Sequence, residues 1–123
     1  MGLDMYAFSC KAEDFGVDKP SERATEIAYW RKFNALHGWM EDLWRSQNPE
    51  DERSFNCIDL HLTSADLLQL SEDIGNNALK PREGFFFGNQ EIYPEHIEST
   101  VKFITDAFEA IEAGRVVFYT SWW

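Results

Sequence analysis

The residues with the clearest capacity for chemistry are a tryptophan, an arginine, an asparagine and a histidine close together in the chain. Trp30, Asn34 and His37 stand at positions i, i+4 and i+7, so on a helix they form one ridge, with Arg31 beside it. This set could bind an anionic or planar ligand, with the indole as a stacking wall. Alternatively, the ridge packs against a loop whose backbone Asn34 and His37 bind. The second role is the commoner one, because the ridge holds no nucleophile and no paired acid.

A second feature is the sequence GFFFG at residues 84–88, in which glycines bracket three phenylalanines. Such a loop carries too much apolar area to lie free in water, so we expect it to cover the core. The alternative is a loop that binds a partner or gates a ligand, since exposed aromatic patches usually mark interfaces. Phe86 from this loop and Tyr119 would complete the candidate ligand pocket.

Metal and cofactor chemistry finds little support. Asp59 and His61 share one face of a predicted strand, and a third metal ligand would have to come from Glu95 or His96. A solvent-facing pair is the more common meaning of this spacing, so we predict no metal site. The chain has no glycine-rich phosphate loop, HExxH pair, paired-cysteine zinc pattern or nucleophile elbow. We therefore predict no cofactor, and the sequence leans against an enzyme.

Net charge limits the partners. The chain has 22 acidic and 11 basic residues and a formal charge of −11, which disfavours nucleic acid and anionic membranes but permits a basic protein surface. A predicted third helix concentrates carboxylates on its outer face: Glu95, Glu98, Asp106, Glu109 and Glu112, against Lys102 alone. The simpler explanation is that acidity keeps a small protein soluble. No apolar run approaches the roughly 20 residues of a membrane span, and we expect a cytoplasmic protein whose Cys10 and Cys57 are reduced and buried.

The stretch Ala24 to Trp44 is the longest helical pattern in the chain. Its 4, 3, 4, 3 spacing predicts a core stripe of Tyr29, Phe33, Leu36, Met40 and Leu43. Strands are predicted over residues 3–10, 55–62 and 115–123. In the second of these, Ile58, Leu60 and Leu62 are expected to point inward. A second helix is expected to open with Thr63 and Asp66 as a capping box and to carry Leu67, Leu70, Ile74 and Ala78. A third begins at Pro94, carries Ile97, Val101, Ile104, Phe108 and Ile111, and ends at Gly114.

These elements predict one domain over residues 1–123 of the α+β class. Three helices would pack on a small, mainly antiparallel sheet of three or more strands, in the chain order β-α-β-α-α-β. The order of the strands within the sheet cannot be read from the pattern.

Four motifs together resemble a known family. They are MGLDMY at the start, AYWRKFNALHGW at residues 28–39, GFFFG, and FYTSWW at residues 118–123. They are similar, in the same order, to a family of small proteins of bacteriophages, prophages and some bacteria with no established activity. The resemblance implies a phage origin and a host-cell cytoplasm. Some relatives carry a phosphoglycerate kinase label, to which this chain, without a phosphate loop, gives no support. Thr120 and the additional Trp123 depart from the terminal YYQSSW-like run of the family.

Two hypotheses follow. In the first, the protein is a non-enzymatic phage accessory protein that binds a host protein, and its acidic third helix imitates nucleic acid to inhibit a host defence system. Carboxylates concentrated on one face would favour it. In the second, a small-molecule-binding protein or minor enzyme has its site at the Trp30, Asn34 and His37 shoulder near GFFFG. A concave site with Arg31 or His37 pointing inward would favour that. The oligomeric state stays open.

Overall fold

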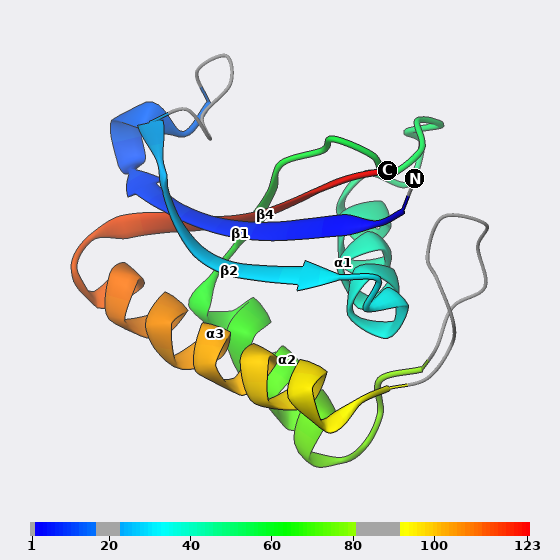
Figure 1. Cartoon of the computed structure of the whole chain (residues 1–123). Coiled ribbons are helices and arrows are strands. Elements are labelled where there is room, and N and C mark those ends of the chain that lie inside the picture. The colour runs from blue at the N-terminus through cyan, green and yellow to red at the C-terminus, as the bar shows by residue number, and fades with distance from the viewer. Residues whose placement is uncertain (1, 17–22, 81–91) are drawn as a thin grey trace.

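The computed structural model describes residues 2–16, 23–80 and 92–123, which form an α+β fold (Figure 1). The described strands are β1 (Asp4–Lys11), β2 (Thr25–Arg31), β3 (Leu60–Leu62) and β4 (Arg115–Trp122); the helices are η1 (Ala12–Asp14, a 3-10 turn), α1 (Asn34–Gln47), α2 (Ser64–Gly75) and α3 (Pro94–Glu112). The strands pair in the order β2-β1-β4-β3, and every pairing is antiparallel. The predicted class of three helices on a mainly antiparallel sheet is confirmed.

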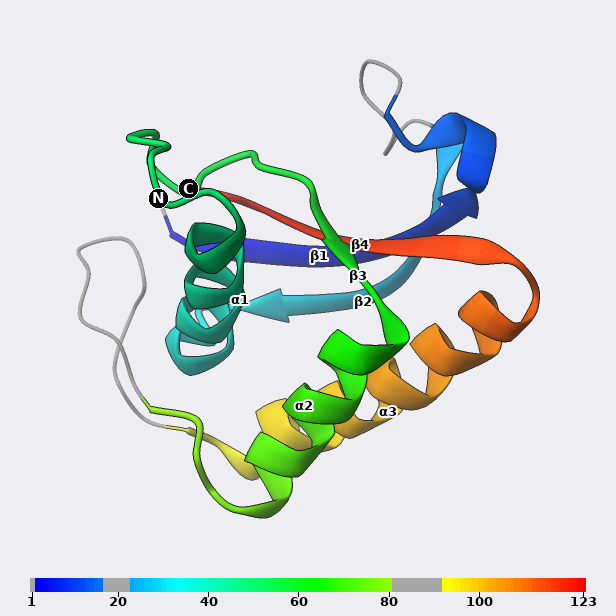
Figure 2. The ribbon, with the colours of Figure 1, turned by 180° about the vertical axis from the view of Figure 1, so that it is seen from behind.

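Helices cover one face of this sheet. Helices α2 and α3 lie side by side below it in two opposite views, and α1 stands at the end of the sheet where the two chain ends lie (Figures 1 and 2). Met5 of β1 pairs with Trp30 of β2 and with Ser121 of β4, and all three side chains are buried on the covered face. Because side chains alternate along a strand, the neighbours of these residues point to the opposite face.

The helix predicted over Ala24 to Trp44 is wrong in nearly its whole first half. Residues 25–31 form β2, and the helix begins only at Asn34. Trp30 is 2% exposed and Tyr29 is 45% exposed, the reverse of the predicted stripe. The segment TEIAYWR is mostly β-branched and aromatic, and it pairs with β1 from Thr25 to Arg31 with one register shift between Ala7 and Phe8.

A left-handed residue separates this strand from the helix. Lys32 has φ 57°, and its backbone N–H donates to the carbonyl oxygen of Leu3 at 2.9 Å. The chain turns there, so that Phe33, Leu36 and Met40 enter the core as predicted. The later part of the predicted stripe is thus correct, although its first residue is not.

The strand predicted over residues 55–62 is also shorter, since only Leu60–Leu62 pairs with β4. Leu60 and Leu62 are buried as expected, and Ile58 is partly buried. Cys57 has φ 60° and interrupts the extended chain. Its thiol is exposed whereas that of Cys10 is buried, so the expectation of two buried thiols is wrong for Cys57.

Helix α2 begins with the predicted capping box. The Thr63 side chain accepts from the Asp66 N–H at 3.2 Å, and the Asp66 carboxylate accepts from the Thr63 N–H at 2.9 Å. Leu67 and Leu70 are buried. The helix ends at Gly75, so Ala78, predicted as its last core position, lies beyond it and is exposed.

Helix α3 begins at Pro94 as predicted and ends at Glu112, shortly before Gly114 at φ 83°. Of its predicted stripe, Ile104 is buried and three residues pack partly buried against the core: Ile97, Phe108 and Ile111. Val101 is instead 51% exposed, and the fully buried positions are Thr100, Phe103 and Ala107. The helix packs on both β2 and α2, which turns its contact face toward the sheet. None of the described helices is long and apolar enough to cross a membrane.

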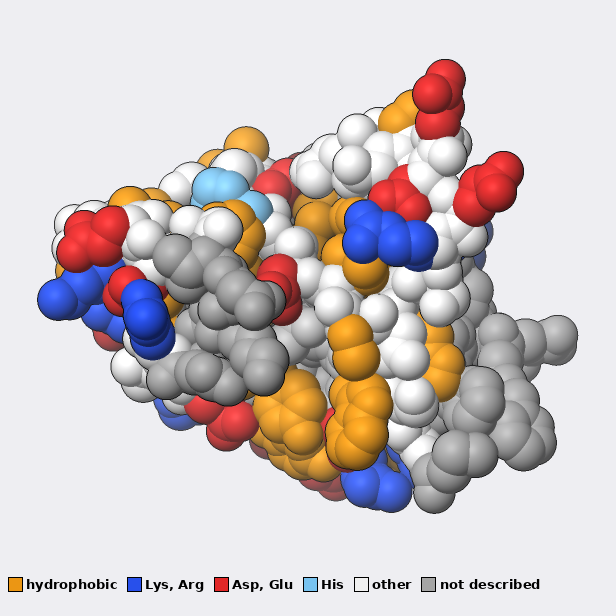
Figure 3. Space-filling model, turned by 90° about the horizontal axis from the view of Figure 1, so that it is seen from above, with side chains coloured by type: hydrophobic (Ala, Val, Ile, Leu, Met, Phe, Trp, Pro, Cys, Tyr) orange, Lys and Arg blue, Asp and Glu red, His pale blue; other side chains and the backbone are white. Residues whose placement is uncertain are grey.

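No described α-helix covers the opposite face of the sheet. Aromatic rings lie along it: Tyr6 contacts Tyr29 with ring centroids 5.2 Å apart, and Phe8 stacks on Phe118 at 5.4 Å. Figure 3 looks onto this side and shows hydrophobic side chains scattered among charged ones. The two faces of the sheet therefore have different surroundings, which matters for the candidate site.

Candidate functional site

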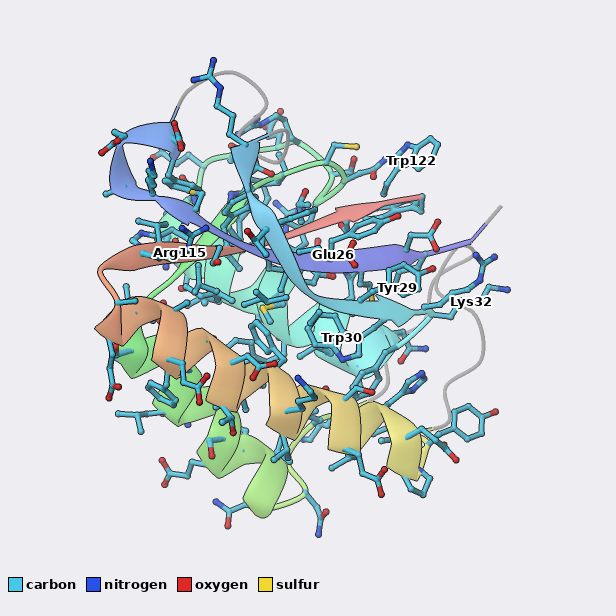
Figure 4. All side chains as sticks on the ribbon, turned by 60° about the vertical axis from the view of Figure 1, so that its left-hand side comes forward. Glu26, Tyr29, Trp30, Lys32, Arg115 and Trp122 are labelled. Carbon is cyan, nitrogen blue, oxygen red and sulfur yellow. The ribbon has the colours of Figure 1, made fainter. Side chains whose placement is uncertain are left out.

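The predicted ridge is divided between a strand and a helix. Trp30 and Arg31 belong to β2, so they point to opposite faces of the sheet, whereas Asn34 and His37 belong to α1. Figure 4 shows Trp30 between the sheet and α3 and Tyr29 on the other side of the strand. The structure therefore brings His37 together with Tyr119 and takes Arg31 away from Trp30.

Trp30 joins the sheet to α3. Its ring meets that of Phe103 edge-on with centroids 5.2 Å apart, and its Nε1–H donates to Thr100 Oγ1 at 3.1 Å. The Thr100 hydroxyl in turn donates to the carbonyl oxygen of His96 at 2.7 Å. An indole N–H buried in a core needs such an acceptor. The geometry gives Trp30 a packing role.

His37 and Tyr119 form a buried polar pair between α1 and β4. His37 Nδ1 lies 2.7 Å from Tyr119 Oη, and both side chains are fully buried. Burial, partly opposed by a hydrogen bond with Ser121, raises the pKa of Tyr119 well above its ordinary value, so the phenol is neutral. The His37 ring also packs on Phe55 and edge-on against Trp123, with centroids 5.2 and 5.0 Å away. The pair fastens the helix to the sheet.

The structure describes Asn34 of the predicted ligand pocket but not Phe86. Asn34 is 2% exposed in the first turn of α1. Phe86 and the whole GFFFG segment lie outside the described residues. The proposed locking of that loop by Asn34 and His37 therefore stays a prediction.

The predicted acidic face lies on α3. Glu95, Glu98, Glu109 and Glu112 are exposed, and Asp106 is partly buried, where it accepts from Lys102 Nζ at 2.6 Å. Helix α2 beside it adds further acids, so the two helices together carry eight carboxylates and one lysine. Their net charge of −7 is most of the chain total of −11.

Asp59 and His61, the pair weighed above as metal ligands, lie together on the surface. Asp59 and His61 line an open pocket of about 470 Å³ with Cys57 and Arg53. Burial raises the pKa of Asp59, and a hydrogen bond from Thr120 opposes the rise. Among the residues that the structure describes, no three His, Cys, Asp or Glu side chains form a group that could hold a metal ion.

One pocket was not predicted from the sequence, although it contains one predicted residue. Arg31 lines a pocket of about 420 Å³ with Gly2, Asp4, Trp122 and Trp123. Antiparallel register creates it, because Asp4 pairs with Arg31 on one side and with Trp122 on the other. The only sequence signal was the pair of tryptophans at 122 and 123, and it did not indicate which strand lies beside them.

Comparison with known proteins adds no relative. No family model, curated protein or solved structure matches the chain.

Proposed function

We propose that the protein is a non-enzymatic binding protein that presents the acidic outer side of α2 and α3 to a basic surface of a partner protein. The observation that carries the proposal is the charge of these two adjacent helices, −7 out of −11. Evenly distributed acidity would serve solubility alone, whereas a concentrated field steers a partner of opposite charge.

Exposed apolar side chains on the same two helices support an interface. Leu68 of α2 is 61% exposed and Val101 of α3 is 51% exposed. Apolar side chains that interrupt a polar, charged surface are typical of protein contact sites. Charge would guide the encounter, and these two residues would add area excluded from water.

The length of α3 favours an elongated basic groove as the complementary surface. Its 19 residues span about 28 Å at 1.5 Å per residue, and Glu95, Glu98, Glu109 and Glu112 are spread along it. Such a row of carboxylates offers negative charge over a distance comparable to a short stretch of nucleic-acid backbone. A host protein whose groove binds nucleic acid, such as a component of a defence system, would be the partner of a phage accessory protein of this kind.

The second hypothesis, a small-molecule site at the Trp30, Asn34 and His37 shoulder, receives less support. These three side chains are at most 2% exposed, and both Trp30 and His37 bond to neighbouring core residues. A ligand at the shoulder would have to displace those contacts. Burial and bonding favour the structural role of the shoulder.

The test compares partner binding by a variant that has lost three negative charges on α3 with binding by a variant that has lost three negative charges elsewhere. In one variant Glu98, Glu109 and Glu112 become glutamine, and in the control Glu13, Glu26 and Glu52 do. All six side chains are exposed, so both variants should fold and both have the same net charge. Each protein is immobilised and exposed to bacterial lysate at low and high salt, and retained proteins are identified by mass spectrometry.

We expect a basic protein retained at low salt by the wild type and by the control, and lost from the α3 variant. High salt should release it from all three, because exposed charges are screened beyond about 10 Å at 0.1 M salt. Equal retention by the α3 variant and the control would refute a role for this face. Retention that is independent of salt would refute the electrostatic basis.

A further inference from the structure

The pocket at the end of the sheet combines aromatic walls with a positive charge, in a protein that is otherwise strongly acidic. It measures about 420 Å³, within the range of small-molecule sites, and Gly2, Asp4, Arg31, Trp122 and Trp123 line it. Three neighbouring strands supply Asp4, Arg31 and Trp122 from paired positions on one face. The sheet therefore holds Asp4, Arg31 and Trp122 in place, while Gly2 and Trp123 lie just beyond the strand ends.

Arg31 forms an ion pair with Asp4 at this pocket. Its Nη1 donates to Asp4 Oδ1 at 3.2 Å, and the hydroxyl of Tyr29 donates to the same oxygen at 2.6 Å. The Arg31 side chain is still 55% exposed. A guanidinium has five N–H donors, so the bond to Asp4 leaves the other donors for a ligand. Asp4 Oδ2 takes part in neither bond, so it can accept a hydrogen bond from a ligand.

Lys32 brings a second cation to the same place. Its φ of 57° is unusual for a side-chain-bearing residue. The turn lays the side chain across Gly2, where an added Cβ would lie 2.8 Å from Lys32 Cε and 3.2 Å from Arg31 Nη2. None of the ion pairs among the described residues includes Lys32. Both cations thus converge on the space beside Gly2.

The two indoles are placed differently. Trp122 is 64% exposed, a high value for the largest apolar side chain. Trp123 is fixed, because Asn56 donates to its carbonyl oxygen at 3.2 Å and accepts from its N–H at 3.1 Å, while its ring meets His37 edge-on. Figure 4 shows Trp122, Tyr29 and Lys32 at the same end of the sheet. One wall is held by the core and the other presents an open π face.

We propose that this pocket binds a nucleoside monophosphate. The base would stack on the indoles of Trp122 and Trp123, and the phosphate would lie against Arg31 and Lys32. Arg31 and Lys32 can both donate to phosphate oxygens. Asp4 lines the same pocket and balances one of the two positive charges, and its Oδ2 can accept a hydrogen bond from a ring or exocyclic N–H. A polynucleotide fits poorly, because the remaining surface of this chain is strongly negative and repels further phosphates. This proposal is independent of the acidic face on α2 and α3.

The experiment is isothermal titration calorimetry of the full chain with AMP, GMP, CMP and UMP. Adenosine, inorganic phosphate and a single-stranded DNA decamer serve as comparison probes. We expect at least one monophosphate to bind at least about ten-fold more tightly than its base or phosphate part alone, since stacking and charge each contribute about that factor. No binding of any monophosphate at millimolar concentration would overturn the proposal, and so would tighter binding of the decamer.

Four variants assign the site. Trp122→Ala and Lys32→Gln should each weaken binding about ten-fold, and both residues are exposed, so the fold should persist. Gly2→Ala should also weaken it, because the new methyl group displaces the flexible end of Lys32. Lys102→Gln on α3 removes the same charge far from the pocket and should leave affinity unchanged. Equal affinities for the Lys32 and Lys102 variants, or an unaffected Trp122 variant, would refute the assignment.

Discussion

Truncating Trp30 and truncating Tyr29 should have very different effects on stability. The two residues are adjacent in β2, and the sheet places them on opposite faces. Trp30 is buried at 2% exposure and bonds to Thr100, while Tyr29 is 45% exposed on the face without a described α-helix. A continuous helix through this segment would have placed Tyr29 in the core stripe.

The magnitudes follow from these surroundings. Trp30→Ala leaves a cavity between β2 and α3 and removes the donor to Thr100, so we expect a loss of about 3–5 kcal/mol. Tyr29→Ala loses a ring contact with Tyr6 and an exposed hydrogen bond to Asp4, about 1 kcal/mol. A chain of this size has a total stability on the order of 5–15 kcal/mol, so the first variant loses a large share.

Urea unfolding followed by circular dichroism measures both values, provided that the wild type unfolds in a single transition. Thermal unfolding should agree, with Trp30→Ala lowering the Tm by roughly 10–20 °C and Tyr29→Ala by roughly 5 °C or less. Trp30→Phe is the matched control for Trp30→Ala, because it keeps most of the packing and loses the N–H donor. Its loss should lie between the other two. Equal losses for the two alanine variants, or a larger loss for Tyr29→Ala, would refute the strand.

Three further predictions concern local features. Gly114→Ala should destabilise the fold by about 1 kcal/mol because φ is 83° there. Gly75→Ala, at the last residue of α2 with open space around it, should be neutral or stabilise the fold by up to about 1 kcal/mol. Losses of similar size in urea unfolding would contradict the role of the left-handed backbone. Thr63→Ala should lower the free energy of unfolding by about 1 kcal/mol because the cap of α2 is lost, and Thr63→Ser should retain most of that stability; thermal unfolding measures both. Hydrogen bonds from Arg53 lower the pKa of Asp51 to about 2 from its ordinary value of 3.8. The contact between these two side chains therefore stabilises the fold above pH 3.8, and this contribution is lost as the pH falls toward 2. NMR titration of the Asp51 carboxyl should give that midpoint, and Arg53→Gln should raise it; an unchanged midpoint would contradict the assignment.

The sequence predicted the elements that have a single strong signal. The capping box at Thr63, proline at the start of α3 and glycine after its end each have a specific backbone cause, and each is found. The helix prediction for residues 25–31 is wrong because the apolar positions of this segment fit a helix as well as a strand. What decides between the two is the edge of β1, a tertiary partner that no local pattern shows.

The candidate site divides in the same way. Outward carboxylates on α3 could be predicted because helical spacing alone assigns them to one side. The pocket of Asp4, Arg31 and Trp122 could not be predicted, because it depends on which strands are neighbours. The register pairs Asp4 with Arg31, 27 positions later in the chain, and with Trp122, 118 positions later. The sequence predicts Arg31 beside Trp30, Asn34 and His37, whereas the structure places it beside Asp4 and Trp122.

The most direct test of the acidic face is the affinity of the retained partner, once it is identified and purified. Its Kd should be measured at two salt concentrations for the wild type, for the triple variant at Glu98, Glu109 and Glu112, and for the control triple variant at Glu13, Glu26 and Glu52. We expect the α3 variant to bind about ten-fold or more weakly at low salt, the control to bind like the wild type, and the difference to shrink at high salt. Equal affinities for the two triple variants at low salt would contradict the proposal.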